Sequence, residues 1–355
     1  MARSVRGIEP LVAAEIRNSR QGRVRALRHR EVWFEPAGSP AGLTGLRTAD
    51  DVLLVAAVVD GVGAARAALR RLAAAARTIT CPPEAAGPPE AAGIEVSASF
   101  VGRRAYTRFE IEDAVGTELA RRLRAPYHSR AGGAVPPGGC AAWRVTIEGE
   151  RAVIAVRLAD RPLHRRAYKT ASIPGTLHPP LAAAMAGLAR LGGAGTVLDP
   201  CCGAGTTLIE AAASAPGARL LGLDHDPAAV AAARANARRA ETGRTAHGGT
   251  RFRWGVSDAG RLPVAGGVVD RVLVNPPWGR QVPPAGLLAG DPDRLWREIR
   301  RVLAPGGLVV ALSYDGDPPG FETVERMEVS LSGRHPVLAV LRLRERRRAS
   351  RGRAG

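Results

Sequence analysis

The sequence predicts an α/β protein in which a doubly wound parallel sheet is preceded by a smaller α+β region. Strand-like and helix-like segments alternate along residues 165–345, as they do in such sheets. Two apolar segments there, Thr196–Asp199 and Val268–Val274, run into loops rich in Gly or Pro, as buried parallel strands do. At 355 residues the chain also exceeds one average domain, which leaves room for further units upstream.

Residues 1–50 predict a small unit of the split βαβ kind. Gly7–Asn18 carries apolar side chains at helical spacing, with Glu15 as the one polar member of that face. The other expected elements are two neighbouring strands, a short helix and a closing strand, at Val24–Leu27, Glu31–Phe34, Ala41–Thr48 and Val52–Val59.

Residues 51–160 predict a second unit. Proline-rich and glycine-rich stretches at Cys81–Gly93 and Ala131–Gly139 mark loops within it. Its expected elements are a strand, a helix and the two strands of a hairpin, at Ile94–Phe100, Phe109–Arg124, Trp143–Glu148 and Ala152–Leu158.

Residues 165–345 predict the parallel sheet, and residues 346–355 a basic tail without fixed structure. Asp226-Pro227 is a favoured helix start, and Asp291-Pro292 repeats it. The expected strands are Thr196–Asp199, Leu220–Leu223, Phe252–Gly255, Val268–Val274 and Leu308–Leu312, followed by an antiparallel pair at Val324–Leu331 and Val337–Leu343.

The charge of the chain favours a polyanionic partner. There are 51 basic and 33 acidic residues, for a formal net charge of +18. Lys169 is the single lysine, which indicates a bias toward GC-rich codons. Such a bias explains Arg in place of Lys but not the surplus of bases over acids, so nucleic acid is the expected partner.

Two further features set expectations about location and metal content. No apolar run reaches the length of a membrane span, and Met1–Pro10 carries charges in place of an apolar signal segment. We therefore expect a cytoplasmic protein with no membrane partner. The four cysteines lack the paired spacing of a zinc site, so we expect reduced thiols and no metal.

A glycine-rich loop joins the strand Thr196–Asp199 to the helix that follows. Its glycines let the backbone approach a ligand closely, and the helix start offers N–H groups to a carboxylate. A dinucleotide fingerprint requires a further glycine where Leu208 stands, so the loop favours S-adenosylmethionine over a pyrophosphate-bearing cofactor. The candidate cofactor contacts in this loop are Asp199, Cys201, Gly203, Gly205 and Thr206.

Two acids downstream strengthen the cofactor hypothesis. Asp224 follows Gly205 by 19 residues and closes the next strand, where a carboxylate accepts ribose hydroxyls. Asp258 follows the strand Phe252–Gly255, from which it could accept the adenine amino group. A tight turn at the glycines and a helix-capping role for Asp224 are the alternatives. Three such features in this order, each at the carboxyl end of a strand, favour a cofactor site.

The segment Asn275-Pro276-Pro277-Trp278-Gly279 follows the strand Val268–Val274 and so lies at the same edge of the sheet. The prolines lack N–H groups and stiffen the turn, which presents carbonyls and one side-chain amide as acceptors. An exocyclic amino group has two N–H donors that such acceptors hold, and its lone pair is then free to attack a methyl group. Trp278 offers a face on which the base stacks.

The candidate catalytic residues are therefore Asn275, Pro276, Pro277 and Trp278, and Asn275 also borders the cofactor. A proline-rich turn with Trp278 covering the core is the alternative. A cysteine nucleophile, as in cytosine-5 methylation, would stand beside the catalytic proline, whereas Cys201 and Cys202 lie far from it in the sequence. We expect both to be small buried residues.

These motifs resemble those of the THUMP-domain RNA methyltransferases, the branch that includes tRNA guanine-2-amino methyltransferases. The catalytic half carries the resemblance in Asp199–Thr206 and Asn275–Gly279. Upstream, Leu163–Lys169 and His178–Ala182 resemble the segment that helps enclose S-adenosylmethionine in that family. The resemblance implies a Rossmann-like class I methyltransferase domain at residues 165–345.

The same resemblance extends to the N-terminal half. Arg6–Leu11 and Phe100–Arg108 fit a ferredoxin-like unit at residues 1–50 and a THUMP-like RNA-binding domain at 51–160. In that family these units grip the acceptor end of tRNA. Our candidate RNA contacts are Arg103, Arg104 and Arg108, with a solvated basic face as the alternative.

The function implied is methylation of the 2-amino group of a guanine in tRNA. An rRNA guanine methyltransferase and a DNA adenine amino methyltransferase share the motifs, but a DNA enzyme would carry its target-recognition region within or after the catalytic domain. A protein-glutamine methyltransferase would not need a basic N-terminal half. A non-catalytic RNA-binding protein is disfavoured by the intact acids, glycines and Asn275.

Overall fold

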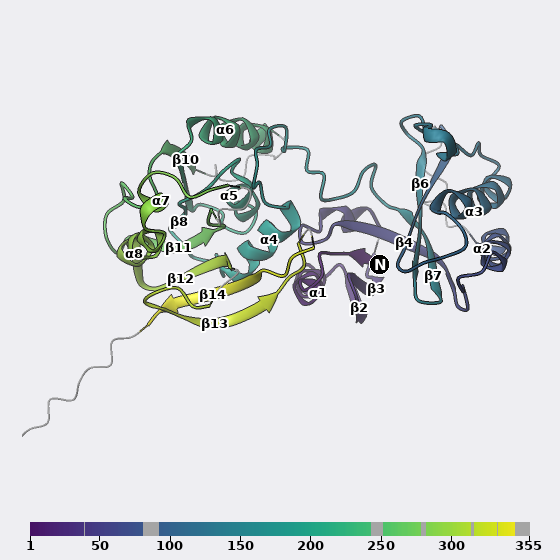
Figure 1. Cartoon of the computed structure of the whole chain (residues 1–355), viewed down its shortest axis with the longest axis horizontal. Coiled ribbons are helices and arrows are strands. Elements are labelled where there is room, and N and C mark those ends of the chain that lie inside the picture. Colours follow the sequence, from purple (N-terminus) through teal and green to yellow (C-terminus); the bar gives the residue numbers. More distant parts are fainter. Residues whose placement is uncertain are drawn as a thin grey trace, which may run out of the picture. The chain divides into compact units, whose positions relative to one another are not determined.

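The computed structural model describes residues 1–38, 40–80, 92–242, 251–277, 282–313, 316–331 and 333–344. The chain forms two compact units (Figure 1). The first comprises Met1–Arg3 and Ala13–Leu163, and the second Ser4–Val12 and His164–Gly355. The sequence did not indicate that residues 4–12 group with the second unit.

A seven-stranded sheet forms the centre of the first unit, in the order β2-β3-β1-β4-β7-β6-β5. Its pairs are antiparallel except for β5 with β6, which run parallel. Its strands are β1 (Ala2–Arg3), β2 (Gly22–Arg28), β3 (Glu31–Pro36), β4 (Asp51–Val59), β5 (Ile94–Phe100), β6 (Ala141–Glu148) and β7 (Arg151–Arg157). Because β4 pairs with both β1 and β7, the strands of the two predicted N-terminal units share one sheet.

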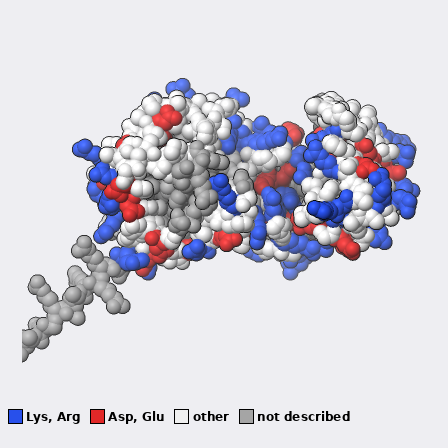
Figure 2. Space-filling model, in the orientation of Figure 1, with Lys and Arg blue, Asp and Glu red and all other residues white. Residues whose placement is uncertain are grey.

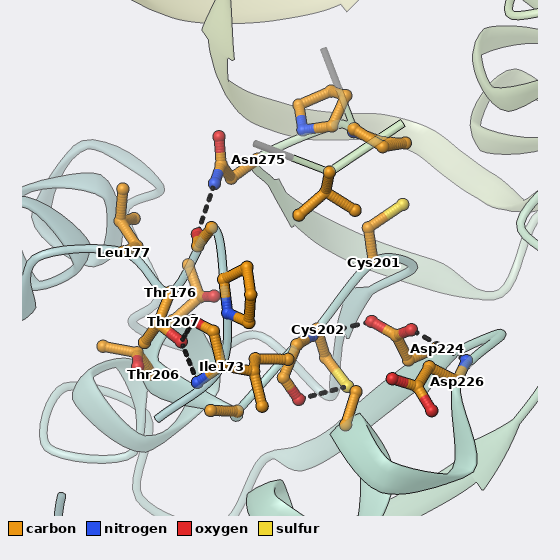
Figure 3. A pocket seen from close by; sticks show the side chains of 18 of the residues that line it. Ile173, Thr176, Leu177, Cys201, Cys202, Thr206, Thr207, Asp224, Asp226 and Asn275 are labelled. Carbon is orange, nitrogen blue, oxygen red and sulfur yellow. Dashed lines mark hydrogen bonds between the residues drawn. The ribbon is translucent and has the colours of Figure 1, made fainter. Parts of the chain in front are cut away.

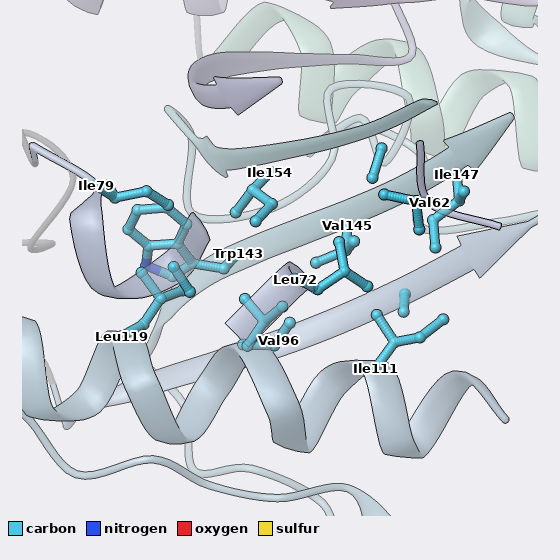
Figure 4. Close-up of a cluster of buried hydrophobic side chains, with 14 of the residues drawn as sticks. Val62, Leu72, Ile79, Val96, Ile111, Leu119, Trp143, Val145, Ile147 and Ile154 are labelled. Carbon is cyan, nitrogen blue, oxygen red and sulfur yellow. The ribbon is translucent and has the colours of Figure 1, made fainter. Parts of the chain in front are cut away.

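The core of the first unit lies between this sheet and two helices, α2 (Ala67–Thr78) and α3 (Arg108–Leu123). Alternate side chains of β5, β6 and β7 point into it, as the period of a strand requires. Trp143 is its largest fully buried side chain (Figure 4). Thr107 begins α3 with a capping box, in which its hydroxyl accepts from the Glu110 N–H and the Glu110 carboxylate accepts from the Thr107 N–H.

Several predicted elements of the first unit need correction. The segment expected as a helix at Ala41–Thr48 is a 3-10 turn, η1 (Pro40–Gly45). Helix α2 was missed because its sequence is nearly all Ala and Arg, with Leu69 and Leu72 as the large apolar side chains. The helix α1 (Glu9–Asn18), the strands and the hairpin turn at 148–150 form as predicted.

The second unit confirms the predicted doubly wound sheet, whose strand order is β10-β9-β8-β11-β12-β14-β13. The first five strands are parallel, and the last two add antiparallel pairs. The strands are β8 (Thr196–Asp199), β9 (Arg219–Asp224), β10 (Arg251–Val256), β11 (Val269–Val274), β12 (Leu303–Ser313), β13 (Phe321–Glu328) and β14 (Val337–Leu343). The helices are α4 (Pro179–Leu188), α5 (Thr206–Ala211), α6 (Pro227–Thr242), α7 (Leu287–Gly290) and α8 (Asp293–Val302).

The strand order reverses at β8, which lies between β9 and β11. The loops after these strands leave the sheet at its carboxyl edge, where doubly wound proteins bind ligands. One boundary differs from the prediction. Gly306-Gly307 lies inside β12, at an irregularity in its pairing with β11. Val269 of β11 pairs with Leu303, whereas Arg271 pairs with Leu308, so β12 has extra residues between these two pairs.

Two searches of the described residues bear on membranes and metals. No helix among them combines the length and the apolar composition needed to cross a bilayer. The same residues contain no cluster of three or more His, Cys, Asp or Glu side chains arranged as metal ligands would be. Within the described residues, the carboxylates of Asp224 and Asp258 lie at the carboxyl edge of the parallel sheet.

Candidate active site

A cavity of about 860 Å³ opens at the carboxyl edge of the second unit's sheet (Figure 3). Its walls come from the loops after β8, β9, β10 and β11, and from the segment before α4. The predicted site residues that line it are Cys201, Gly203, Thr206, Asp224, Asp258, Asn275, Pro276 and Pro277. Motifs separated by up to 76 positions, as Cys201 and Pro277 are, therefore share one cavity.

Two predicted residues, Asp199 and Gly205, do not line the cavity but support the glycine-rich loop through buried contacts. Asp199 is 1% exposed, and its carboxylate accepts from the Thr207 hydroxyl at 2.5 Å and from the Cys201 N–H at 3.1 Å. Burial raises the pKa of Asp199 to about 7. Gly205 has a φ of +80°, and a Cβ there would lie 2.9 Å from the Trp254 ring. The structure thus places both residues under the turn.

Asp224 closes β9 and faces the cavity beside the glycine loop (Figure 3). One carboxylate oxygen accepts from the Gly203 N–H at 2.8 Å, and the other accepts from the Asp226 N–H at 3.1 Å. The side chain is 13% exposed. Each carboxylate oxygen has a second lone pair, so these contacts fix the orientation of Asp224 without exhausting its acceptor capacity.

Asp258 lies after β10 and is held in the same way. Its Oδ1 accepts from the Gly260 N–H at 2.7 Å, and its Oδ2 accepts from the Leu287 N–H at 2.8 Å. Gly286 makes the second contact possible, because a Cβ at that position would lie 2.1 Å from Asp258 Oδ2. Two carboxylates from neighbouring strand ends thus line one cavity in fixed orientations.

Asn275 follows β11 and lines the cavity together with Pro276 and Pro277. Its Nδ2 donates to the carbonyl oxygen of Gly175 at 3.5 Å, which turns the amide oxygen away from that partner (Figure 3). A Cβ at Gly175 would lie 2.7 Å from a Val282 methyl, so the contact depends on glycine there. Trp278, the fourth predicted catalytic residue, lies outside the described residues.

The wall beside the glycine loop comes from a segment before α4 that includes Lys169 and residues 173–178. The fully buried Asn236 of α6 holds this segment in place. Its Oδ1 accepts from the N–H groups of Thr170 and Ala171 at 3.0 Å, and its Nδ2 donates to the Ala204 carbonyl at 3.0 Å. One amide thus ties the wall to the glycine loop.

A second buried side chain, Glu210 of α5, anchors the same segment. Its carboxylate pairs with Arg166 at 3.0 Å and accepts from the Tyr168 hydroxyl at 2.8 Å. The family resemblance had pointed to this stretch, but residue patterns alone had identified neither Asn236 nor Glu210. A polar side chain inside an amphipathic helix gives no sequence signal that it is buried.

Cys201 and Cys202 are poor nucleophiles in this setting. Burial raises the pKa of both thiols, and the negative charges of Asp199 and Asp224 raise it further. Because the thiolate is the reactive form, this geometry favours the inert thiol.

The three arginines predicted to contact RNA differ in their surroundings. Arg103 is exposed, and Arg108 is exposed with its guanidinium 4.6 Å from the Phe109 ring centroid. Arg104 instead donates to the carbonyl oxygens of Val62, Gly63 and Gly149 at 3.0, 3.1 and 2.5 Å. Its guanidinium is therefore occupied within the first unit, which makes a structural role more consistent with its contacts than binding to RNA.

Arg104→Ala is expected to lower the free energy of unfolding by about 2–3 kcal/mol, because three loop carbonyls lose a charged donor. Arg103 is the adjacent residue and its side chain is exposed, so Arg103→Ala is expected to change the free energy of unfolding by less than about 0.5 kcal/mol. Urea denaturation followed by circular dichroism measures both. Equal stability of the two variants would show that the Arg104 contacts contribute little.

Comparisons with known proteins show which proteins this chain is similar to. A sequence profile for the family described as "RMKL-like, methyltransferase domain" matches residues 166–319. The tRNA (guanine(6)-N2)-methyltransferase of Thermus thermophilus is 33% identical over 261 residues, which are 71% of this chain and 72% of that protein. The U6 snRNA (guanine-N(2))-methyltransferase THUMPD2 of Bos taurus is 33% identical over 184 residues, covering 48% of this chain and 34% of THUMPD2.

Similarity also extends to a solved structure. TrmN from Thermus thermophilus matches with a TM-score of 0.74 and 28% sequence identity, and the match covers 97% of this chain and 98% of TrmN. Both units of the chain therefore have counterparts in that structure.

Proposed function

Because this chain belongs to the same family as the tRNA (guanine(6)-N2)-methyltransferase of Thermus thermophilus, we propose that it methylates the 2-amino group of a guanine in tRNA, with S-adenosylmethionine as methyl donor. One observation carries the chemistry. The Asn275-Pro276-Pro277 turn lines the same cavity as Asp224, Asp258 and the glycine-rich loop. A methyl donor and a planar amine held by these groups would meet inside a single cavity.

The residues of the cavity fit S-adenosylmethionine. Its volume of about 860 Å³ lies within the range of small-molecule sites and exceeds what one nucleoside needs. In our proposal Asp224 accepts the ribose hydroxyls and Asp258 accepts the adenine amino group, each with lone pairs that its backbone hydrogen bonds leave over. Gly203 presents bare backbone to the cavity, and among the described residues a Cβ at that position would meet the Ile173 side chain at 3.7 Å. Cys201 and Thr206 complete the proposed contacts.

S-adenosylmethionine supplies a methyl group on a positively charged sulfur. The chain's task is to hold an amine in line with that group. In our proposal the Asn275 amide oxygen and the Pro276 carbonyl accept the two N–H donors of the guanine amino group. Pro277 keeps the turn rigid and contributes no competing N–H. The rate enhancement then comes from proximity and orientation, with no covalent enzyme intermediate.

The choice of RNA rests on charge and on the relatives. Basic side chains are spread over both units on the face drawn in Figure 2, in keeping with the net charge of +18. The relatives described above are named as guanine methyltransferases of tRNA and U6 snRNA. We therefore favour guanine in RNA over adenine in DNA, and tRNA over rRNA because the match to the tRNA enzyme covers 71% of this chain.

The test incubates the purified chain with S-adenosylmethionine carrying a labelled methyl group and with tRNA transcripts, rRNA fragments or duplex DNA as separate substrates. Label is expected in tRNA, and nucleoside digestion is expected to recover it as N2-methylguanosine. Label confined to rRNA would move the substrate to that class of RNA. Label in DNA or in the protein itself would contradict the proposal.

A further inference from the structure

The strands of the first unit carry basic side chains on the face that points away from α2 and α3. Trp143 and Val145 of β6 belong to the helix-covered core, so Arg144 between them projects to the other side. Val156 of β7 belongs to the core as well, and Arg157 next to it projects like Arg144. Arg144 pairs in register with Ala155, which places Arg157 one diagonal step away on the same face.

Two carboxylates near these arginines are already engaged. Asp51 pairs with Arg157 at 2.8 Å, and both side chains are nearly buried, at 11% and 13% exposed. Glu31 pairs with Arg3 at 2.5 Å. Arg3 is the register partner of Asp51, which brings the two ion pairs next to each other.

Arg144 has no such partner. Its guanidinium donates to the Ser97 hydroxyl at 3.3 Å, and within the described residues no carboxylate lies in ion-pair contact with it. Three guanidiniums, from Arg3, Arg144 and Arg157, thus lie near two carboxylates that are paired with Arg3 and Arg157.

The electrostatic cost of this arrangement falls on Arg144. Burial lowers the pKa of its guanidinium, and the positive charges of Arg3, Arg157 and Arg130 lower it further, opposed by Asp51. A half-buried cation among like charges is destabilising unless an anion completes the cluster.

We propose that Arg144, with Arg157 beside it, forms a binding site for a backbone phosphate of the RNA. The identity of the anion rests on the proposed function. The forked guanidinium of Arg144 matches phosphate oxygens in a bidentate geometry, and the Ser97 hydroxyl, which accepts from it, holds the guanidinium in place. The cluster is distinct from Arg103, Arg104 and Arg108, which the sequence had suggested.

The test compares Arg144→Gln with Arg70→Gln. Arg70 lies exposed on α2, in the same unit, so its replacement removes the same charge away from the cluster. Fluorescence anisotropy with a labelled tRNA transcript, without S-adenosylmethionine, measures affinity as a function of salt, and thermal unfolding measures the Tm. Arg144→Gln is expected to weaken tRNA binding by about tenfold and to reduce the salt slope by about one. Arg70→Gln is expected to change affinity less than about twofold.

The Tm separates a binding role from a structural one. Relief of repulsion is expected to leave the Tm of Arg144→Gln equal to or above that of the wild type. Unchanged tRNA affinity in Arg144→Gln, or an equal loss in Arg70→Gln, would overturn the proposal. A Tm that falls in Arg144→Gln and falls equally in Arg144→Lys, which keeps the charge, would overturn it as well. Inorganic phosphate is the second probe. A rise in Tm with phosphate that is lost in Arg144→Gln, together with unchanged tRNA affinity in that variant, would assign the site to free phosphate instead.

These outcomes are independent of methyl transfer. If the wild-type chain methylates guanine in tRNA and Arg144→Gln binds tRNA normally, the phosphate site is refuted and the proposed function stands. If tRNA binding depends on Arg144 but no guanine is methylated, the proposed function fails and the phosphate site stands.

Discussion

Replacing Asn275 by alanine is expected to lower kcat for methyl transfer by about a thousandfold, as the loss of one preorganised polar group at a reacting centre commonly does. The amide oxygen would no longer hold one N–H of the acceptor, so the nitrogen would lose its alignment with the methyl group. Single-turnover transfer of labelled methyl to tRNA measures the effect on chemistry. The affinity for S-adenosylmethionine, measured by calorimetry, is expected to stay within about threefold, because Asp224 and Asp258 are untouched.

Asn275→Asp is the matched control. It keeps an acceptor oxygen at the same position and alters the other half of the amide, which donates to the Gly175 carbonyl. Partial activity, above that of Asn275→Ala, is expected from it. An alanine variant that keeps a tenth or more of the wild-type rate would show that Asn275 does not orient the acceptor.

Asp224→Ala is expected to weaken S-adenosylmethionine binding by about a hundredfold, since two hydrogen bonds to a charged group contribute about 3 kcal/mol or more. The carboxylate also accepts from the Gly203 N–H, so its removal loosens the glycine-rich loop as well. Calorimetric titration with S-adenosylmethionine and with S-adenosylhomocysteine gives the Kd directly.

The neighbouring Asp226 supplies the comparison for Asp224. It also lines the cavity, but its carboxylate accepts from the Ala228 N–H at 2.8 Å as the cap of α6. Asp226→Ser keeps a capping hydroxyl while it removes the charge. Its Kd is expected to stay near the wild-type value. Equal weakening in both variants would mean that cavity charge, rather than a specific contact of Asp224, controls binding.

Much of the second unit could be predicted because its signals are local. A run of apolar residues ending in Gly, Pro or Asp marks the carboxyl end of a buried strand, and parallel topology brings those ends to one edge. For that reason Asp224, Asp258 and Asn275 could be placed at one cavity from sequence order alone. The Asp226 cap of α6 could be predicted as well, because an Asp-Pro pair at a helix start forms its capping contact with residues next to it in the sequence.

What sequence reasoning missed depends on long-range packing. The strand β1 is two residues long and forms through pairing with β3 and β4. Asn236 and Glu210 look like surface residues of helices, yet each is buried against a segment more than 35 positions away. Asp199 and Gly205 have the expected residue types for a cofactor loop, but the sequence does not tell which loop residues face a ligand and which support the turn from below.

The arginines show the same limit in the first unit. Arg103, Arg104 and Arg108 stand close together in the sequence, which suggested a common basic face. In the structure Arg104 donates to backbone carbonyls, and Arg3, Arg144 and Arg157 come together from three different strands instead. Adjacency in sequence is a weak guide to charge clusters, because a sheet brings together strands that are far apart along the chain.

The central claim is that this chain places a methyl group on the 2-amino group of a guanine in tRNA. Mass spectrometry of nucleosides from purified tRNA and rRNA, compared between a strain with the chain and one that lacks it, tests the claim most directly. We predict that N2-methylguanosine falls in the tRNA of the deletion strain, stays constant in its rRNA, and returns with the wild-type chain but not with Asn275→Ala. An unchanged N2-methylguanosine content in tRNA, together with the loss of a different methylated nucleoside, would contradict the account.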